Sequence, residues 1–158
     1  MVVIEAATSA DINPVVERWV ELAQDQRTYD SHILADENRG AVRDSIARHI
    51  IEDGLLVARD SGIVGFVMFE LQTGLYQQTT TRGLIQNVYV APSHRNEGVG
   101  SALLDEAEAL LAERGAEVFS LDVMARNENA RRLYENRGYE PHRIEMEKSD
   151  ESDNHSKE

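Results

Sequence analysis

The middle of the chain limits the fold most, because an apolar strand pattern there runs through a polar loop with two glycines into a helical pattern. Residues 84–90 are mostly apolar and end before Pro92, whereas residues 98–114 repeat apolar side chains at helical spacing. A further strand is predicted over 118–123. A strand, a helix and a second strand in this order predict a right-handed crossover that joins two parallel strands.

The rest of the chain predicts antiparallel strands and amphipathic helices. Asp60-Ser61-Gly62 between two apolar runs is typical of a β-hairpin, and Asn13-Pro14 after a capping-box-like 8–11 is typical of a helix start. The predicted elements are a strand over 2–6, helices over 14–27 and around 42–53, hairpin strands over 55–58 and 63–71, a loop over 72–82, a helix over 127–137 and an extended segment over 139–147. The predicted fold class is therefore α/β, with a mixed, mostly antiparallel central sheet and one parallel strand-helix-strand crossover.

A chain of 158 residues fits one domain, which we place at 1–148, followed by a disordered acidic tail at 149–158. No apolar run approaches the roughly 18 residues of a membrane span, and the first residues lack the basic start of a signal peptide. The chain has no cysteine, which excludes disulfides, thiolate nucleophiles and cysteine-bound zinc. These features predict a cytoplasmic protein with no membrane partner.

The net charge of −13 means that the protein repels phosphate polymers, so a nucleic-acid partner is not expected. All but two of the 16 basic residues are arginines. Acidic, lysine-poor composition is typical of proteins from a salt-loaded cytoplasm, and an ordinary acidic protein is the alternative. The scattering of Asp and Glu over every predicted helix favours the high-salt interpretation.

On the high-salt interpretation, the thermal midpoint of unfolding should rise between low salt and molar KCl. The physical reason is that counterions screen the repulsion among the excess carboxylates of the folded state. Thermal denaturation across that range of KCl measures the effect. A midpoint that is flat or falls would indicate an ordinary acidic protein.

The loop that opens the central helix has the chemistry of an anion site. A helix start exposes unpaired amides and a positive dipole end, and Gly98 and Gly100 let an anion approach the backbone closely. The guanidinium of Arg95 could add charge-assisted hydrogen bonds to the same anion. The alternative is that the two glycines only permit tight packing of the helix against the sheet.

Two other phosphate-binding motifs fit this loop less well. Asp122 follows Gly100 by 22 residues, which is close to the spacing of the ribose-binding acid in a dinucleotide site. However, seven residues separate the strand from Gly98, and Leu103 replaces the third glycine of that motif. Asp122 is also expected inside a strand, not at its end. A P-loop is excluded because no Gly-Lys-Ser/Thr sequence follows the loop.

Two signatures in this sequence resemble those of the GNAT acyltransferase superfamily. The acyl-coenzyme A motif V-x-P-x-x-R/Q-x-x-G-x-G/A is matched from Val90 to Gly100, and N-x-x-A-x-x-L-Y-x-x-x-G-F/Y is matched from Asn127 to Tyr139. Every defined position agrees, and the two signatures stand in the family's order. The resemblance implies a GNAT-like fold and acetyl-coenzyme A as the acyl donor.

The resemblance also implies roles for the backbone of the donor site. Amides of the loop and helix start would hold the pyrophosphate of coenzyme A; these residues are Arg95, Asn96, Gly98, Val99, Gly100 and Ser101. Backbone groups of Val88 and Val90 would pair with the pantetheine arm, and the Val90 amide would polarise the thioester carbonyl. Asn127 would contact the cofactor from the next helix start, where it is equally suited to cap the helix.

The implied reaction is direct attack of a neutral primary amine on the thioester, without a metal. Tyr134 matches the family's proton donor to the leaving sulfur, and a core tyrosine is the alternative. Asp122 corresponds to an acidic position that some members use as general base, and the alternative is a solvent-facing strand residue. Glu70 is a weaker candidate for the base, while Gln86 and Asn87 are neutral where other members place a glutamate.

These features predict an N-acetyltransferase acting on a small-molecule amine or on the N-terminus of a peptide or protein. The alternative is a non-catalytic acyl-coenzyme A binding or regulatory domain. The acceptor would be shaped by residues 25–40, by the loop over 72–82 and by the final segment. Because that final segment is short, one wall of the pocket would come from a second subunit, which suggests a homodimer. His94 is expected to be a loop contact, and the histidines show no metal-ligand spacing.

Overall fold

The computed structural model describes residues 1–150, and the predicted tail lies outside the described residues from 151 onward. The regular elements are β1 (Val3–Ala6), α1 (Ile12–Arg27), α2 (Arg39–Ile51), β2 (Leu55–Arg59), β3 (Ile63–Leu71), β4 (Arg82–Val90), α3 (Val99–Glu113), β5 (Val118–Leu121) and α4 (Glu128–Asn136). Short 3-10 turns occupy Ser9–Asp11, Asp36–Asn38 and Pro92–His94. None of the helices in this part of the chain has the length and apolar character that a membrane crossing requires.

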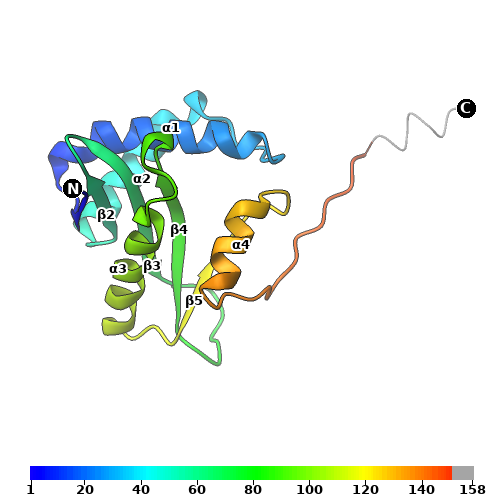
Figure 1. Cartoon of the computed structure of the whole chain (residues 1–158). Coiled ribbons are helices and arrows are strands. Elements are labelled where there is room, and N and C mark those ends of the chain that lie inside the picture. Colours follow the sequence, from blue (N-terminus) through cyan, green and yellow to red (C-terminus); the bar gives the residue numbers. More distant parts are fainter. Residues whose placement is uncertain (151–158) are drawn as a thin grey trace, which may run out of the picture.

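The five strands form one mixed sheet in the order β1-β2-β3-β4-β5 (Figure 1). The first three pairings are antiparallel and only β4 and β5 run parallel, joined through α3. The predicted fold class is therefore confirmed, including the hairpin of β2 and β3 and the parallel strand-helix-strand crossover.

Buried side chains alternate along the strands between two cores, one on each face of the sheet. Leu55 and Val57 of β2 pack in the core that α1 and α2 cover, whereas Leu56 and Ala58 pack in the core that α3 covers. Apolar side chains are therefore needed on both faces of the central strands, which is why these strands are nearly continuous apolar runs in the sequence.

The predicted capping box closes the 3-10 turn Ser9–Asp11, which leads directly into α1. The Thr8 amide donates to Asp11 Oδ2 at 2.9 Å, and Arg59 on β2 donates to both carboxylate oxygens of Asp11, at 3.1 and 3.2 Å. Burial acts to raise the pKa of Asp11, but the hydrogen bonds from Arg59 and Thr8 outweigh it and hold the pKa below its usual value. The helix begins at Ile12, two residues before the predicted start at 14.

One expectation for the C-terminal third is wrong. β5 ends at Leu121, so Asp122 lies directly after the strand and not within it. The last paired residues are Ile85 and Leu121, and β4 has a register shift immediately beyond Ile85, so β5 loses its partner there. The argument against a dinucleotide site that placed Asp122 inside a strand therefore fails. The other two arguments, the length of the loop before Gly98 and Leu103 in place of the third glycine, still hold. The segment over 139–147, which was predicted to be extended, pairs with no strand among residues 1–150.

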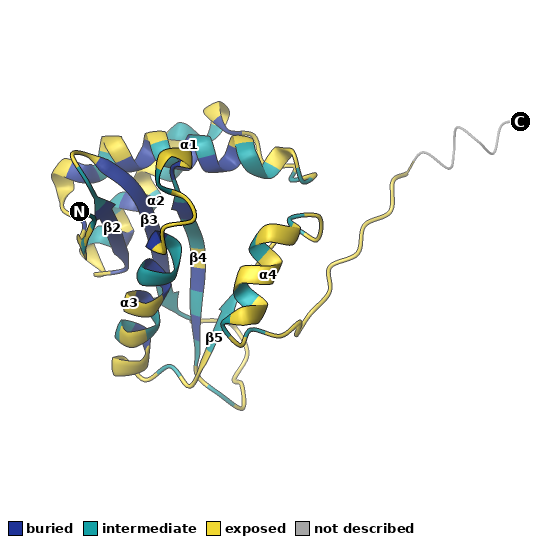
Figure 2. Cartoon of the chain, viewed as in Figure 1, coloured by how far each residue is buried: buried dark blue, intermediate teal, exposed yellow. Residues whose placement is uncertain are grey.

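Burial is distributed unequally along the chain (Figure 2). The buried residues extend from Ala7 to Leu111, and none of the described residues from 112 to 150 is buried. Side chains of β5 and α4, such as Phe119 and Tyr134, pack only at the margin of the core under α3.

Candidate active site

The sheet opens between β4 and β5, and this opening positions the candidate site. The two strands pair from Arg82 to Ile85, with Val118 to Leu121 as partners, whereas β4 continues to Val90. The residue that is extra in β4 at its register shift is Gln86, which makes it a bulge. Beyond it the side of β4 that faces away from β3 has no strand partner among the described residues.

Backbone groups of β4 are available along this open side. The Ala91 amide donates to Val64 O of β3 at 2.8 Å, and Phe66 of β3 is the partner of Tyr89. Because successive backbone groups of a strand alternate in direction, those of Val88 and Val90 face the open side. The two residues predicted to pair with an extended ligand are therefore the two with outward backbone groups.

The loop between β4 and α3 presents free amides. The first hydrogen bond within α3 runs from Ala102 N to Gly98 O at 3.0 Å, so the amides of Val99, Gly100 and Ser101 have no partner inside the helix. Asn96 and Gly98 adopt left-handed backbone angles, with φ of 64° and 83°. This conformation and the helix dipole make the loop a suitable cradle for a phosphate group.

The alternative explanation for the glycines, close packing of the helix on the sheet, is not supported. A Cβ on Gly98 would meet nothing within 4 Å, and one on Gly100 would lie at an ordinary 3.6 Å from Val90. Gly98 is instead required by its positive φ at the N-terminal cap of α3. The glycine pattern therefore serves the shape and access of the loop.

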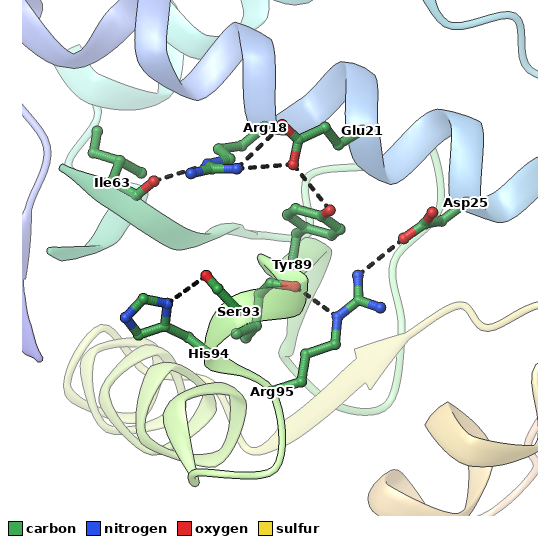
Figure 3. Close-up of polar contacts among 9 residues, drawn as sticks. Arg18, Glu21, Asp25, Ile63, Tyr89, Ser93, His94 and Arg95 are labelled. Atoms are coloured by element: carbon green, nitrogen blue, oxygen red, sulfur yellow. Dashed lines mark hydrogen bonds and ion pairs between the residues drawn. The ribbon is translucent and has the colours of Figure 1, made fainter. Parts of the chain in front are cut away.

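The side chain of Arg95 crosses back toward α1 (Figure 3). Its Nε donates to Val90 O at 2.9 Å, its Nη2 donates to Asp25 Oδ2 at 3.0 Å, and its guanidinium lies 5.4 Å from the centre of the Tyr89 ring. The Tyr89 hydroxyl in turn donates to Glu21 on α1 at 3.0 Å. Arg95 thus joins the end of β4 to α1, and an anion bound by the same Nη2 would displace Asp25.

Replacing Arg95 with alanine should weaken coenzyme A binding by about 1.5 to 3 kcal/mol if its guanidinium reaches the pyrophosphate, the usual scale of a hydrogen bond to a charged group. Isothermal titration calorimetry measures the change. Asp25→Asn is the matched control, because it frees the same guanidinium and should leave the affinity equal or higher. Unchanged affinity in Arg95→Ala would assign Arg95 only to the bridge between β4 and α1.

His94 makes the loop contact expected of it. Its Nε2 lies 2.9 Å from Asp60 Oδ2 in the hairpin turn, and its Nδ1 lies 2.7 Å from the Ser93 hydroxyl. The histidine therefore ties the loop to the β2–β3 turn.

A hollow of about 100 Å³ lies at the point where β4 and β5 separate. Three predicted site residues from separate parts of the chain line it together: Val88, Asp122 and Tyr134. Its other lining residues come from α1 and the loop that follows, and from the neighbouring strands: Trp19, Leu22, Ala23, Gln26, Ser31, Ile33, Ile85, Gln86, Asn87 and Leu121. The hollow is lined by apolar side chains and by the uncharged polar side chains of Gln26, Ser31, Gln86 and Asn87, and its one carboxylate is that of Asp122.

Tyr134 enters the hollow from α4, whose first turn is capped by Asn127. The Asn127 Oδ1 accepts a hydrogen bond from Ala130 N at 3.2 Å, so the predicted capping role is confirmed. Its partly desolvated position raises the pKa of Tyr134 to about 12. The phenol is therefore protonated throughout the neutral range and can donate a proton to a departing group.

Glu70 lies outside the hollow and belongs to a polar cluster beneath the bulge. His49 of α2 is buried, its Nδ1 donates to Ser45 O at 2.7 Å, and its Nε2 lies 2.6 Å from Gln86 Oε1 and 3.2 Å from Glu70 Oε1. Gln86 thus connects this cluster with the hollow. Asp122 is left as the carboxylate at the site, because Glu70 is directed to His49 and Arg48.

Sequence reasoning missed two contributions to the site. Trp19 and Leu22 are part of the wall of the hollow although they occur as ordinary core positions in an amphipathic helix. His49 carried no signal at all, because a single histidine on a helix face is not distinctive until Gln86 and Glu70 are brought beside it.

The comparison with known families agrees with this geometry. The acetyltransferase (GNAT) family model matches residues 16–139, which span strands β2 to β5, the loop and α4. The chain belongs to this family, and it is an acetyl-coenzyme A dependent acyltransferase.

Among individual relatives, an aminoalkylphosphonate N-acetyltransferase of Salmonella typhimurium is 28% identical over 136 residues, which cover 84% of this chain and 81% of that protein. An uncharacterized N-acetyltransferase of Archaeoglobus fulgidus is 34% identical over 84 residues, covering 52% and 57% of the two chains. The crystal structure of a GCN5-related N-acetyltransferase from Ralstonia eutropha superposes with a TM-score of 0.76 at 23% identity, covering 94% and 98%. The last comparison shows a shared fold.

Proposed function

We propose that this protein transfers the acetyl group of acetyl-coenzyme A to the primary amine of a small molecule or peptide, with the opening between β4 and β5 as its active site. The observation that supports this most directly is the meeting of Val88, Asp122 and Tyr134 around one hollow. The donor would extend from the loop at the start of α3 along the open side of β4. The acceptor would enter from the α1 side.

When bound, acetyl-coenzyme A supplies a thioester whose carbonyl carbon is open to attack. The Val90 amide would donate a hydrogen bond to the carbonyl oxygen, where negative charge develops. The amides of Arg95, Asn96 and the first turn of α3 would hold the pyrophosphate by hydrogen bonds and dipole. Asn127 would contact the donor from the start of α4.

The two proton transfers would be divided between Asp122 and Tyr134. Asp122, directly or through water, would accept the proton of the attacking amine, since its carboxylate is the one that lines the hollow. Tyr134 would donate its phenolic proton to the departing sulfur. No metal is required in this scheme, because the amine is itself a nucleophile once neutral.

The acceptor class follows from the lining and from the relatives. A lining of apolar and uncharged polar side chains with one carboxylate suits an amine on a carbon chain that also carries polar groups. The Salmonella relative is named for aminoalkylphosphonates, and AAC(6')-Iy, a structural neighbour with a TM-score of 0.69, is described with a coenzyme A–acetylneamine bisubstrate analogue. A cytoplasmic location, a high-salt setting and the absence of nucleic-acid or membrane partners stay predictions of the sequence.

The test is an acetyl-coenzyme A consumption screen with thiol release as the readout, over aminoalkylphosphonates, aminoglycosides, polyamines, amino acids and peptide N-termini. Amine-dependent thiol release above the rate of hydrolysis is expected for one of these classes. Acetyl-coenzyme A that binds by calorimetry without release for any amine would support the binding-domain alternative instead.

A further inference from the structure

His49 is a buried ring with an oxygen beside each of its nitrogens. It lies on α2 with 1% of its surface exposed, and it has no role in the proton transfers assigned to Asp122 and Tyr134. Ser45 O is 2.7 Å from Nδ1, and Gln86 Oε1 is 2.6 Å from Nε2. Both oxygens only accept hydrogen bonds, so both ring nitrogens must donate. A neutral imidazole carries one N–H and an imidazolium carries two, so these contacts require the charged form of the ring.

A carboxylate beside the ring supplies the matching charge. Glu70 Oε1 is buried and accepts no hydrogen bond from any group in residues 1–150. His49 Nε2 lies 3.2 Å from this oxygen, and Arg48 Nη1 lies 3.5 Å from it and 3.1 Å from Glu52 Oε1. One arginine thus stands between two carboxylates, and the group is neutral overall only when His49 is charged. A buried carboxylate without a compensating charge is costly, which favours the imidazolium.

The contact with His49 fixes which end of the Gln86 amide faces the ring. Gln86 is the extra residue of the bulge in β4, and it lines the hollow together with Asp122. Its oxygen is held by the ring, and its NH2 group has no hydrogen-bond partner within the described part of the chain. If Nε2 lost its proton, the amide would turn over to donate to the ring, and the oxygen would become the free end. The charge on His49 therefore decides whether Gln86 offers a donor or an acceptor.

We propose that His49 is a positioning residue which, as an imidazolium, keeps the NH2 group of Gln86 available to the amine acceptor. The NH2 group donates a hydrogen bond to an ether, hydroxyl, carbonyl or anionic oxygen that the acceptor carries near its amine. Because Gln86 and Asp122 line one hollow of about 100 Å³, a single small acceptor can reach both. The site thereby selects such amines over plain alkylamines. This inference rests on the proposed function, since it specifies the acceptor of that reaction.

The charge of the ring can be measured in the protein without any ligand. Long-range ¹H–¹⁵N NMR spectra distinguish an imidazolium from the two neutral forms of a histidine ring, and resonance assignment identifies the His49 signals. At neutral pH both His49 nitrogens should carry protons. Glu70→Gln, which removes the carboxylate charge and keeps the size of the side chain, should leave Nε2 without a proton. A parent ring whose Nε2 lacks a proton would overturn the proposal, whatever the protein acetylates.

Glu52→Gln is the matched control for that measurement. It removes the other carboxylate that contacts Arg48, which is exposed and lies on the same helix as His49. Both protons of the His49 ring should therefore stay in place. Loss of the Nε2 proton in Glu52→Gln as well as in Glu70→Gln would contradict a specific pairing of His49 with Glu70.

The effect on the acceptor is measured with two amines of equal length. The ether oxygen of 2-methoxyethylamine, which only accepts hydrogen bonds, stands where butylamine has a methylene group. The ratio of the two kcat/KM values is compared between each variant and the parent, which cancels the different reactivities of the amines. Glu70→Gln and Gln86→Leu should each lower the preference for the ether about fivefold, which corresponds to about 1 kcal/mol for one neutral hydrogen bond. Glu52→Gln should keep the parental ratio.

The outcomes separate this inference from the proposed function. An unchanged ratio in Glu70→Gln and Gln86→Leu, with both amines acetylated, would overturn the role of His49 and leave acetyl transfer intact. Failure of the parent protein to acetylate either of the two amines would contradict the acceptor preference stated here. Failure across the whole amine screen would contradict the proposed function, and the ring spectrum would still decide the charge of His49.

Discussion

Tyr134→Phe is expected to lower kcat about 100-fold while the KM for acetyl-coenzyme A changes little. The substitution keeps the ring that packs at the margin of the α3 core and removes only the hydroxyl. Loss of a general acid costs about 10² to 10⁴ in rate, and the lower end is expected because a thiolate is a tolerable leaving group. Steady-state kinetics with the acceptor found in the screen, under conditions where chemistry limits turnover, measure the effect.

Tyr139→Phe is the matched control for that experiment. The two rings lie 6.0 Å apart, but the Tyr139 hydroxyl donates to Glu108 instead of facing the hollow. Its removal should lower stability modestly and leave kcat near that of the parent protein. If Tyr134→Phe kept the parental kcat, Tyr134 would be a packing residue and the proton donor would have to be water.

Gly54→Ala is expected to destabilise the fold by about 3 kcal/mol, a large part of the 5 to 15 kcal/mol typical of a domain. A Cβ at Gly54 would lie 2.3 Å from Phe69 O, and the Phe69 amide donates to Gly54 O at 2.9 Å. The methyl group would push β2 away from β3 at a fully buried residue, because a backbone atom cannot move aside as a flexible side chain does. Urea denaturation at equilibrium gives the change in free energy of unfolding.

Gly40→Ala provides the comparison for that effect. Gly40 lies in the first turn of α2, and a Cβ there would meet nothing within 4 Å. Alanine should leave stability unchanged or raise it by about 0.5 kcal/mol, since it reduces the conformational freedom of the unfolded chain. If the Gly54→Ala and Gly40→Ala variants had equal free energies of unfolding, the backbone between α2 and β2 would have to accommodate the methyl group without loss of stability.

Local signals in the sequence were sufficient for most of the fold. Hairpin, crossover and helix patterns depend on neighbouring residues, and so does the cap by Asn127. These features could be predicted because the residues that cause them are within a few positions of one another.

The incorrect or missing predictions concern contacts between distant residues. Where β5 ends depends on the bulge at Gln86 in another strand, so Asp122 was placed in the wrong local structure. The direction of the Arg95 side chain depends on Asp25, which lies 70 residues earlier in the sequence. A strand pattern in the final segment could not by itself say whether its own chain supplies a partner.

The unequal burial of the chain gives the two walls of the active site different local stabilities. Amides in β3, β4 and α3 surround fully buried side chains and should exchange with solvent only on global unfolding, whereas those of α4 open at a lower free energy. A ligand that contacts both walls binds only the form in which α4 is folded in place. At a ligand concentration of 100 times Kd, binding therefore adds about 2.7 kcal/mol to the free energy of opening α4. The rate of amide hydrogen exchange in α4 would therefore report whether a ligand occupies the loop between β4 and α3, although the two segments are far apart in the sequence.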